Sequence, residues 1–220
     1  MVGDKMLQDN KIFSKIFFWM FIGLAITFGV GYYVSLNENM LYNVFSKYYW
    51  FFIIAEIVVV IWLSARINKM QPMTAKILFC LYSFITGLTF SSIFVVYEMM
   101  SIMLIFGITS LIFLIFALMG YYTNIDLTKF GVYLFMALIG VIICSLINIF
   151  VGSYKFDLGI TIVCLIIFIA YIAYDMQVIK KRLYHISNED NLAIYGALQL
   201  YLDFINIFIR LLRLFGKSRD

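Results

Sequence analysis

Two acidic residues, Asp175 and Asp203, lie inside long apolar segments of the chain, where ionisable side chains are rare. A carboxylate in that position is costly unless a partner or water compensates its charge. Asp175 and Asp203 belong to the last two apolar segments, which are consecutive and therefore antiparallel if both cross a membrane. If the two carboxyl groups face each other at hydrogen-bond distance, they cannot both ionise cheaply, so we predict that they share a proton.

The same pair predicts an element that responds to protons and attracts cations. Loss of the shared proton would make the two carboxylates repel each other, and a hard cation such as Ca²⁺ would then find oxygen ligands. Two Asp residues cannot supply the roughly 6–8 oxygens of a tight Ca²⁺ site, so we expect a weak metal site at Asp175 and Asp203. The alternative is that each Asp only makes an interhelical hydrogen bond that holds the helices together.

Two further charged residues belong to the second apolar segment, Glu56 in its interior and Arg66 at its end. Arg66 is the nearest plausible counter-ion for an ionised Asp175 or Asp203, although it is equally an ordinary flanking residue. Glu56 is ten residues from Arg66, which is ~15 Å along a helix, so the two cannot pair directly without a bend or water. The alternative for Glu56 is a local structural hydrogen bond.

The last apolar segment also carries a polar stripe: Gln199, Asp203, Asn206, Arg210 and Arg213. Their alternating steps of four and three residues place them on one face of a helix. We expect that face to point into the protein or into a water-filled cavity.

The elements that must position these residues are membrane helices, because 65% of the residues are hydrophobic and only 13% are charged. Soluble domains have roughly 45–50% apolar residues, and a helix needs about 20 of them to span the hydrocarbon core. We predict an all-α integral membrane protein with seven transmembrane helices. The expected spans are 16–36, 48–65, 75–97, 102–122, 130–152, 158–179 and 192–215.

These spans predict a cytoplasmic N-terminal tail (1–15), one transmembrane domain (16–215) and a short C-terminal tail (216–220). The N-terminus is placed in the cytoplasm because most Lys and Arg residues fall on its side, apart from a basic cluster at the C-terminus. That cluster leaves two alternatives for the last segment, a full crossing, which we prefer, or a re-entrant segment. Contact between Asp175 and Asp203 further requires the sixth helix to continue past Lys180 or the seventh to start deeper.

Several function classes find no support. The sequence has no Walker motif, nucleophile elbow, HExxH or GxGxxG, so we expect neither an enzyme nor a resident cofactor. Basic residues flank apolar spans, which argues against nucleic-acid binding. Gly87 with Ser91 and Gly140 with Cys144 are pairs of small residues that we expect to allow close helix packing.

Four blocks of the sequence carry a family resemblance. They are 81–94, 138–140, 173–180 and 196–208, the last followed by Leu211, Leu212 and Arg213. Together they resemble the Bax inhibitor-1 family (transmembrane BAX inhibitor motif proteins), and bacterial members in particular. The first two helices match less well.

The resemblance implies a seven-helix bundle with a central C-terminal helix and a pH-sensitive Ca²⁺ leak across a bacterial inner membrane. Asp175 and Asp203 match the family's di-aspartyl sensor, and Arg66 and Glu56 are similar in position to its basic and acidic partners. The expected partners are lipid, Ca²⁺ as the permeant ion, protons and other membrane proteins. Two alternatives remain: an H⁺-coupled Ca²⁺ antiporter, or a stress, cell-death or membrane-protease regulator that acts by protein contact.

Overall fold

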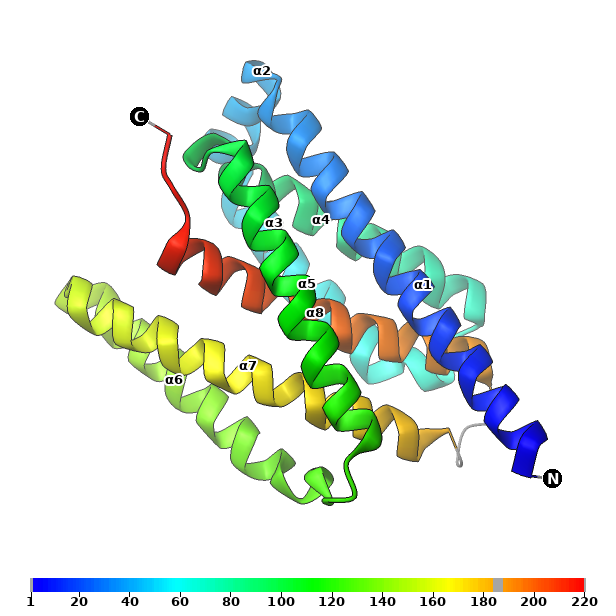
Figure 1. Cartoon of the computed structure of the whole chain (residues 1–220). Helices are drawn as coiled ribbons and strands as arrows, with labels where there is room; N and C mark the ends of the chain where they lie inside the picture. The colour runs from blue at the N-terminus through cyan, green and yellow to red at the C-terminus, as the bar shows by residue number, and fades with distance from the viewer. Residues whose placement is uncertain (1, 184–187, 220) are drawn as a thin grey trace. The chain divides into compact units, whose positions relative to one another are not determined.

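A computed structural model describes residues 2–183 and 188–219 of the chain (Figure 1). The long helices are α1 (Val2–Ser35), α3 (Tyr49–Arg66), α4 (Pro72–Val96), α5 (Met99–Tyr122), α6 (Gly131–Val151), α7 (Tyr154–Arg182) and α8 (Glu189–Phe215). Short elements lie between some of them: α2 (Glu38–Tyr42), the π-helical turn η1 (Asn43–Lys47), and the 3-10 turns η2 (Ile67–Lys69) and η3 (Leu127–Phe130).

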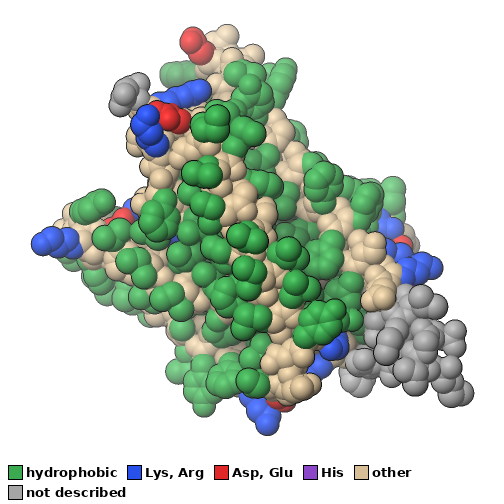
Figure 2. Space-filling view, in the orientation of Figure 1, with side chains coloured by type: hydrophobic (Ala, Val, Ile, Leu, Met, Phe, Trp, Pro, Cys, Tyr) green, Lys and Arg blue, Asp and Glu red, His purple; other side chains and the backbone are tan. Residues whose placement is uncertain are grey.

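Seven helices within the described ranges are long and apolar enough to cross a membrane, which confirms the predicted fold class. Hydrophobic side chains spread along the sides of these helices, and charged side chains lie mainly toward helix ends (Figure 2). In a lipid solvent this distribution satisfies both groups, because lipid covers the apolar sides and water reaches the ends. The first helix starts earlier than its predicted span, so residues 2–15 of the predicted tail are helical.

Helix α8 differs from the other six in burial and in composition. About 72% of the most apolar 18-residue stretch of α8 is buried, against 44% or less of the corresponding stretch in each of the others. This burial is expected for a central C-terminal helix. Its 27 residues form one continuous helix about 40 Å long, which exceeds the ~30 Å hydrocarbon core. That length favours the full crossing over the re-entrant alternative.

The described chain forms two compact units, and α8 contributes residues to both. The first unit comprises Met1–Glu98, Arg182–Tyr201 and Ser218–Asp220. In it α1 and α4 run side by side (Figure 1), and α3 packs on α4. Gly87 allows the close approach of α1, since a Cβ there would meet Val30 and the Thr27 backbone. The expectation of close packing is therefore confirmed at Gly87.

Both ends of the first unit are tied by polar contacts. Where α8 begins, Asp190 accepts hydrogen bonds from Lys15 of α1 at 3.1 Å and from Lys76 of α4 at 2.8 Å. Where α4 ends, the backbone N–H of Arg219 donates to the Val96 carbonyl at 2.8 Å. Asp190 is an acid in the first turn of α8, where the helix dipole favours a negative charge. The Arg219 N–H satisfies one of the carbonyl groups that the C-terminal end of α4 leaves unpaired.

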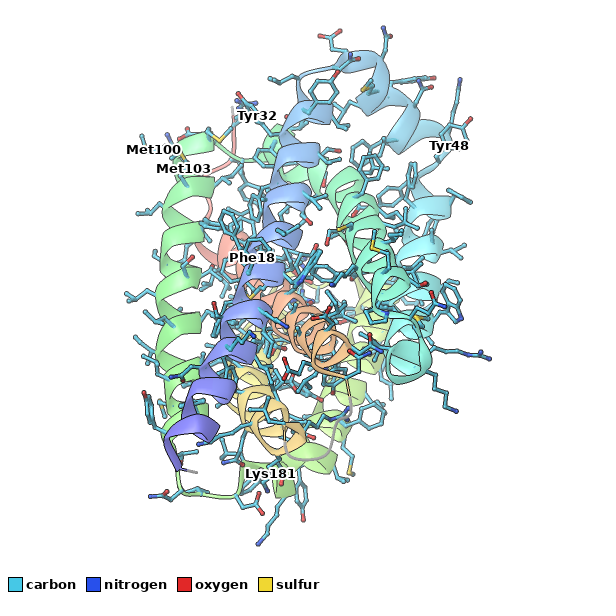
Figure 3. All side chains as sticks on the ribbon, turned by 90° about the vertical axis from the view of Figure 1, so that its right-hand side faces the viewer. Phe18, Tyr32, Tyr48, Met100, Met103 and Lys181 are labelled. Carbon is cyan, nitrogen blue, oxygen red and sulfur yellow. The ribbon has the colours of Figure 1, made fainter. Side chains whose placement is uncertain are left out.

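The second unit comprises Met99–Lys181 and Leu202–Lys217. Helices α6 and α7 lie side by side (Figure 1) around an apolar cluster of Val141, Ile160, Cys164 and Ile167. The first turns of α5 present Met100 and Met103 outward (Figure 3), where both side chains are exposed. This unit contains both of the predicted sensor carboxylates.

Candidate functional site

Asp175 and Asp203 are brought together in the second unit, on α7 and on the C-terminal part of α8. Helix α7 continues past Lys180 to Arg182, which is one of the two conditions for contact. Both residues are almost fully buried, with exposed fractions of 4% for Asp175 and 3% for Asp203. Buried acidic residues with so little solvent contact need a specific partner to be tolerated.

Each carboxyl group is the partner of the other. The Asp203 side chain interacts with Asp175 through a hydrogen bond and through charge. A hydrogen bond between two carboxyl groups requires a proton on one of them, since an ionised carboxylate only accepts. The Asp203 Oδ2 atom is buried and has no hydrogen-bond partner among the described residues, so the pair retains an unused acceptor. This arrangement is able to hold one proton and to release it.

Tyr171 is a neighbour of the pair that the sequence reasoning missed. It lies one helical turn before Asp175 on α7 and within electrostatic range of both Asp175 and Asp203. The four-residue spacing from Asp175 was the available signal, because residues four apart share a helix face. Its phenol adds a third ionisable group beside the two carboxyls.

Close packing fixes the part of α7 that carries Asp175. A Cβ at Gly120 of α5 would clash with the backbone of Ala173, and a Cβ at Gly131 of α6 would clash with the Tyr174 ring. Two glycines therefore let α5 and α6 approach α7 on either side of the residues just before Asp175. A contact of this kind transmits strain rather than absorbing it, because packed interiors compress little.

A second anchor holds α7 just after Asp175, and no pattern in the sequence predicted it. The Gln177 side chain accepts a hydrogen bond from the Leu127 N–H at 2.6 Å and donates one to the Ile125 carbonyl at 2.8 Å. Lys180 donates to the Tyr121 carbonyl at 2.7 Å. Gln177 thus joins α7 to the connection between α5 and α6, which we call the α5–α6 loop (123–130), and Lys180 joins α7 to the end of α5.

An ion pair completes this anchor at the end of α7. Lys181 lies at the helix end (Figure 3), where its ammonium group donates to Asp126 at 2.6 Å and to the Thr128 hydroxyl at 2.8 Å. The Lys181 ammonium and the Thr128 hydroxyl lower the pKa of the Asp126 carboxyl to about 2. Asp126 also accepts from the Thr128 N–H and so caps the N-terminus of the 3-10 turn η3.

Glu56 lies in the first unit, half-buried on α3. Its carboxyl group accepts a hydrogen bond from the Thr89 hydroxyl of α4 at 3.3 Å. Further hydroxyl groups are buried in the same unit, where the Tyr201 phenol and the Thr27 hydroxyl are 2.6 Å apart. The structure therefore gives Glu56 the local hydrogen bond that was its alternative interpretation, and leaves its role toward the Asp pair a prediction.

Arg66 ends α3 in the first unit, and its side chain is exposed. Nothing in the geometry of either unit by itself tests its pairing with Asp175 or Asp203, so that pairing stays a prediction. The ten-residue separation of Glu56 and Arg66 along one helix agrees with the expectation that they do not pair directly.

The polar stripe of α8 is only partly buried. Asp203 is buried, Gln199, Asn206 and Arg210 are half-buried, and Arg213 is exposed. Asn206 donates to the Leu202 carbonyl of its own helix at 2.8 Å, and Arg213 forms an ion pair with Asp157 of α7. The stripe thus changes along α8 from a buried carboxyl to a surface ion pair.

The Asp pair offers few ligands for a metal ion. Within residues 2–183 and 188–219, no group of three or more His, Cys, Asp or Glu side chains is placed to hold a metal. Two carboxyl groups provide fewer oxygens than a tight Ca²⁺ site needs. The weak Ca²⁺ site at Asp175 and Asp203 therefore stays a prediction.

Comparison with known proteins gives a consistent match over nearly the whole chain. Residues 9–220 match the model of a family described as "Inhibitor of apoptosis-promoting Bax1". The chain is 41% identical to the inner membrane protein YbhL of Escherichia coli K12, over 94% of this chain and 91% of the relative.

Two further relatives are uncharacterised proteins. One, from Borreliella burgdorferi, is 40% identical over 99% of this chain and 96% of its own length. Another, from Deinococcus radiodurans, is 34% identical over 100% of this chain and 96% of its own length. Relatives of nearly equal length mean that the whole seven-helix chain is the shared unit.

Proposed function

This chain belongs to the Bax inhibitor-1 family of multi-pass integral membrane proteins, and from that premise we propose that it is a pH-sensitive, Ca²⁺-permeable leak channel. The proposed location is a bacterial inner membrane, as the name of the Escherichia coli relative suggests, with the N-terminus in the cytoplasm. We propose no catalytic reaction and no resident cofactor. Ca²⁺ is the permeant ion, protons are the regulator, and contacts with other membrane proteins are compatible with this role.

One observation carries the proposal: two buried carboxyl groups on adjacent helices are each other's hydrogen-bond partner. A purely structural role would be served as well by an amide or a hydroxyl, which carry no cost of ionisation. Two acids in contact instead make the stability of the α7–α8 contact depend on a proton. The pair is therefore suited to sensing pH.

The gating step follows from the charge on the pair. With one proton between them, Asp175 and Asp203 hold α7 and α8 together, and the path for ions is shut. Loss of the proton leaves two like charges in a medium of low dielectric, so the helices separate. Arg66 is proposed to bridge the carboxylates in the closed state, whereas Glu56 is proposed to keep its structural hydrogen bond with Thr89.

The same charge also explains why a cation would enter. The deprotonated pair attracts Ca²⁺ with too few oxygens to bind it tightly, so the ion passes on down its gradient. Anchors on both sides of Asp175 support this role, because Gly120 and Gln177 hold α7 while the charge on the pair changes.

The experiment that tests the proposal is Ca²⁺ flux into liposomes that contain the purified full chain. The pH is made equal on both sides and varied from 6 to 8. We compare wild type with Asp175→Asn and Asp203→Asn, and use Asp126→Asn as the matched control, because Asp126 is an acid outside the buried pair. Wild type and the control should leak more at pH 8 than at pH 6, and the two pair variants should not respond.

Each other outcome identifies a different function. Flux that appears only when a proton gradient is imposed would mean an H⁺-coupled antiporter. Folded protein without Ca²⁺ flux at any pH would mean a regulator that acts by contact. A Ca²⁺ leak that keeps its pH response in Asp203→Asn would mean that Asp175 and Asp203 are not the pH sensor.

A further inference from the structure

An open apolar groove lies between α6 and α7 in the second unit, away from the Asp pair. Its volume is about 390 Å³, and Gly140 and Cys144 of α6 and Lys155, Gly159 and Ile167 of α7 are among its lining residues. No function considered above uses this groove. Its position between two lipid-exposed helices raises the question of what fills it.

Two glycines keep the groove open. A Cβ at Gly140 or Gly159 would meet no heavy atom of the described residues within 4 Å. Gly120 on α5 is the contrast, since its Cβ would clash with α7. The expectation of close helix packing at the Gly140–Cys144 pair is therefore wrong at Gly140, where a Cβ would meet open space among the described residues, whereas Cys144 packs against the apolar cluster between α6 and α7. The missing side chains at Gly140 and Gly159 create space instead.

The length of the groove matches one leaflet of a bilayer. Lys155 lies in the first turn of α7, where the chain re-enters the membrane after Gly152 ends α6 with a φ of 64°. Ile167, at the other end of the lining, is twelve residues further along α7, or ~18 Å. Half of the ~30 Å hydrocarbon core is ~15 Å.

The mouth of the groove carries a positive charge without an internal counter-ion. Lys155 is exposed and makes no ion pair with any residue that the structure describes. The nearby acid, Asp157, is already paired with Arg213 of α8. The N-terminus of α7 adds the positive end of its helix dipole. An anionic group at headgroup depth would therefore be attracted to this mouth.

We propose that this groove is a binding site for an anionic phospholipid, with one acyl chain along Gly140 and Gly159 and its phosphate on Lys155. Apolar contact in the groove orders the chain, and Lys155 selects an anionic over a zwitterionic headgroup. A basic side chain near the membrane surface should favour the anionic lipid about fivefold. The site is independent of the ion leak proposed above.

The test measures which lipid the purified full-length protein retains. Protein in detergent is mixed with equal amounts of phosphatidylglycerol and phosphatidylcholine of identical chains, and bound lipid is counted by native mass spectrometry. The variants are Lys155→Gln, Lys155→Arg and Gly140→Leu. Lys47→Gln and Gly107→Leu are matched controls, because Lys47 is an exposed lysine outside the groove and a Cβ at Gly107 also meets open space. Thermal unfolding checks that every variant is folded.

The expected result is a preference of wild type for phosphatidylglycerol that Lys155→Gln lowers about fivefold and Lys155→Arg keeps. Gly140→Leu should fill the groove and lose both lipids, while the controls behave as wild type. Equal retention of the two lipids by wild type, or unchanged retention in Gly140→Leu, would overturn the proposal. So would full competition by soluble glycerol phosphate, because that result would indicate a simple anion site without acyl-chain binding.

Discussion

Two acidic sites within the predicted spans of this protein, Glu56 and the Asp175–Asp203 pair, have contrasting surroundings. Glu56 is half-buried and accepts a hydrogen bond from the Thr89 hydroxyl. Asp203 is almost fully buried, its partner is another carboxyl group, and its Oδ2 atom has no hydrogen-bond partner among the described residues. One acid has a neutral donor, and the other has a second acid.

That difference separates a structural role from a switching role. A hydroxyl donates to a carboxyl oxygen whether the acid is charged or neutral, so the Glu56–Thr89 contact survives titration. Two carboxyl groups in contact change from attraction to repulsion when one proton leaves. The sensor role should therefore belong to the pair, and the pH response should be insensitive to Glu56.

The largest effect is expected from the pair itself. A single titrating proton changes the deprotonated fraction by up to about tenfold per pH unit, so wild-type Ca²⁺ flux should rise strongly between pH 6 and 8. Asp175→Asn and Asp203→Asn should each remove that dependence, and the double variant should resemble either single variant, because the two residues act as one unit. Liposome flux of the four proteins measures this. Additive effects of the two substitutions would mean that the residues titrate separately.

A smaller effect is expected from loosening the helix that carries Asp175. Gln177→Ala removes both hydrogen bonds to the α5–α6 loop and leaves the Leu127 N–H and Ile125 carbonyl without this partner. Leaving such groups unpaired should cost about 2 kcal/mol of stability. Unfolding in detergent measures the loss, and hydrogen exchange should increase in residues 123–130 first. Unchanged exchange there would show that the loop does not depend on Gln177.

The sequence predicted the seven spans because continuous apolar runs are unambiguous, but it made some helices too short at both ends. Helix α7 occupies Tyr154–Arg182, whereas its predicted span was 158–179. Apolarity marks the part of a helix that lies in lipid, and the polar turns at Tyr154 and Arg182 remain helical beyond it. That extension beyond Lys180 is also what the contact between Asp175 and Asp203 required.

The sequence predicted those site residues whose type alone indicates an energetic cost inside a membrane. Asp175 and Asp203 stand out because acids inside a membrane need partners. Gln177 did not stand out, because its partners are backbone groups of residues 125 and 127, which no spacing rule connects to α7. The prediction of close helix packing at Gly140 was wrong, because a glycine is compatible both with close packing and with open space. Only the positions of the neighbouring helices decide which of the two occurs.

Glu56 should show a smaller effect than Gln177. Glu56→Gln keeps an oxygen that accepts from Thr89, so it should lower stability by about 1 kcal/mol or less, the contribution of one hydrogen bond. The pH response of Ca²⁺ flux should keep its wild-type midpoint. Flux and thermal unfolding of the same preparation test both points. A shifted midpoint would move Glu56 from the structural group to the sensor and would break the comparison between the two acidic positions.

The smallest effect is expected at Asp126, an acid outside the membrane spans. Lys181 and Thr128 lower its pKa to about 2 from an ordinary value of 3.8. A lowered pKa stabilises the folded protein above pH 3.8, and that stabilisation is lost as the pH falls through about 2. Asp126 is therefore fully ionised from pH 6 to 8, and Asp126→Asn should lower the unfolding temperature slightly and equally across that range, since exposed ion pairs contribute little. A change in the pH dependence of Ca²⁺ flux in Asp126→Asn would contradict this expectation, because a group that stays ionised from pH 6 to 8 cannot sense pH in that range. The pH response would then depend on the α5–α6 loop rather than on the buried pair.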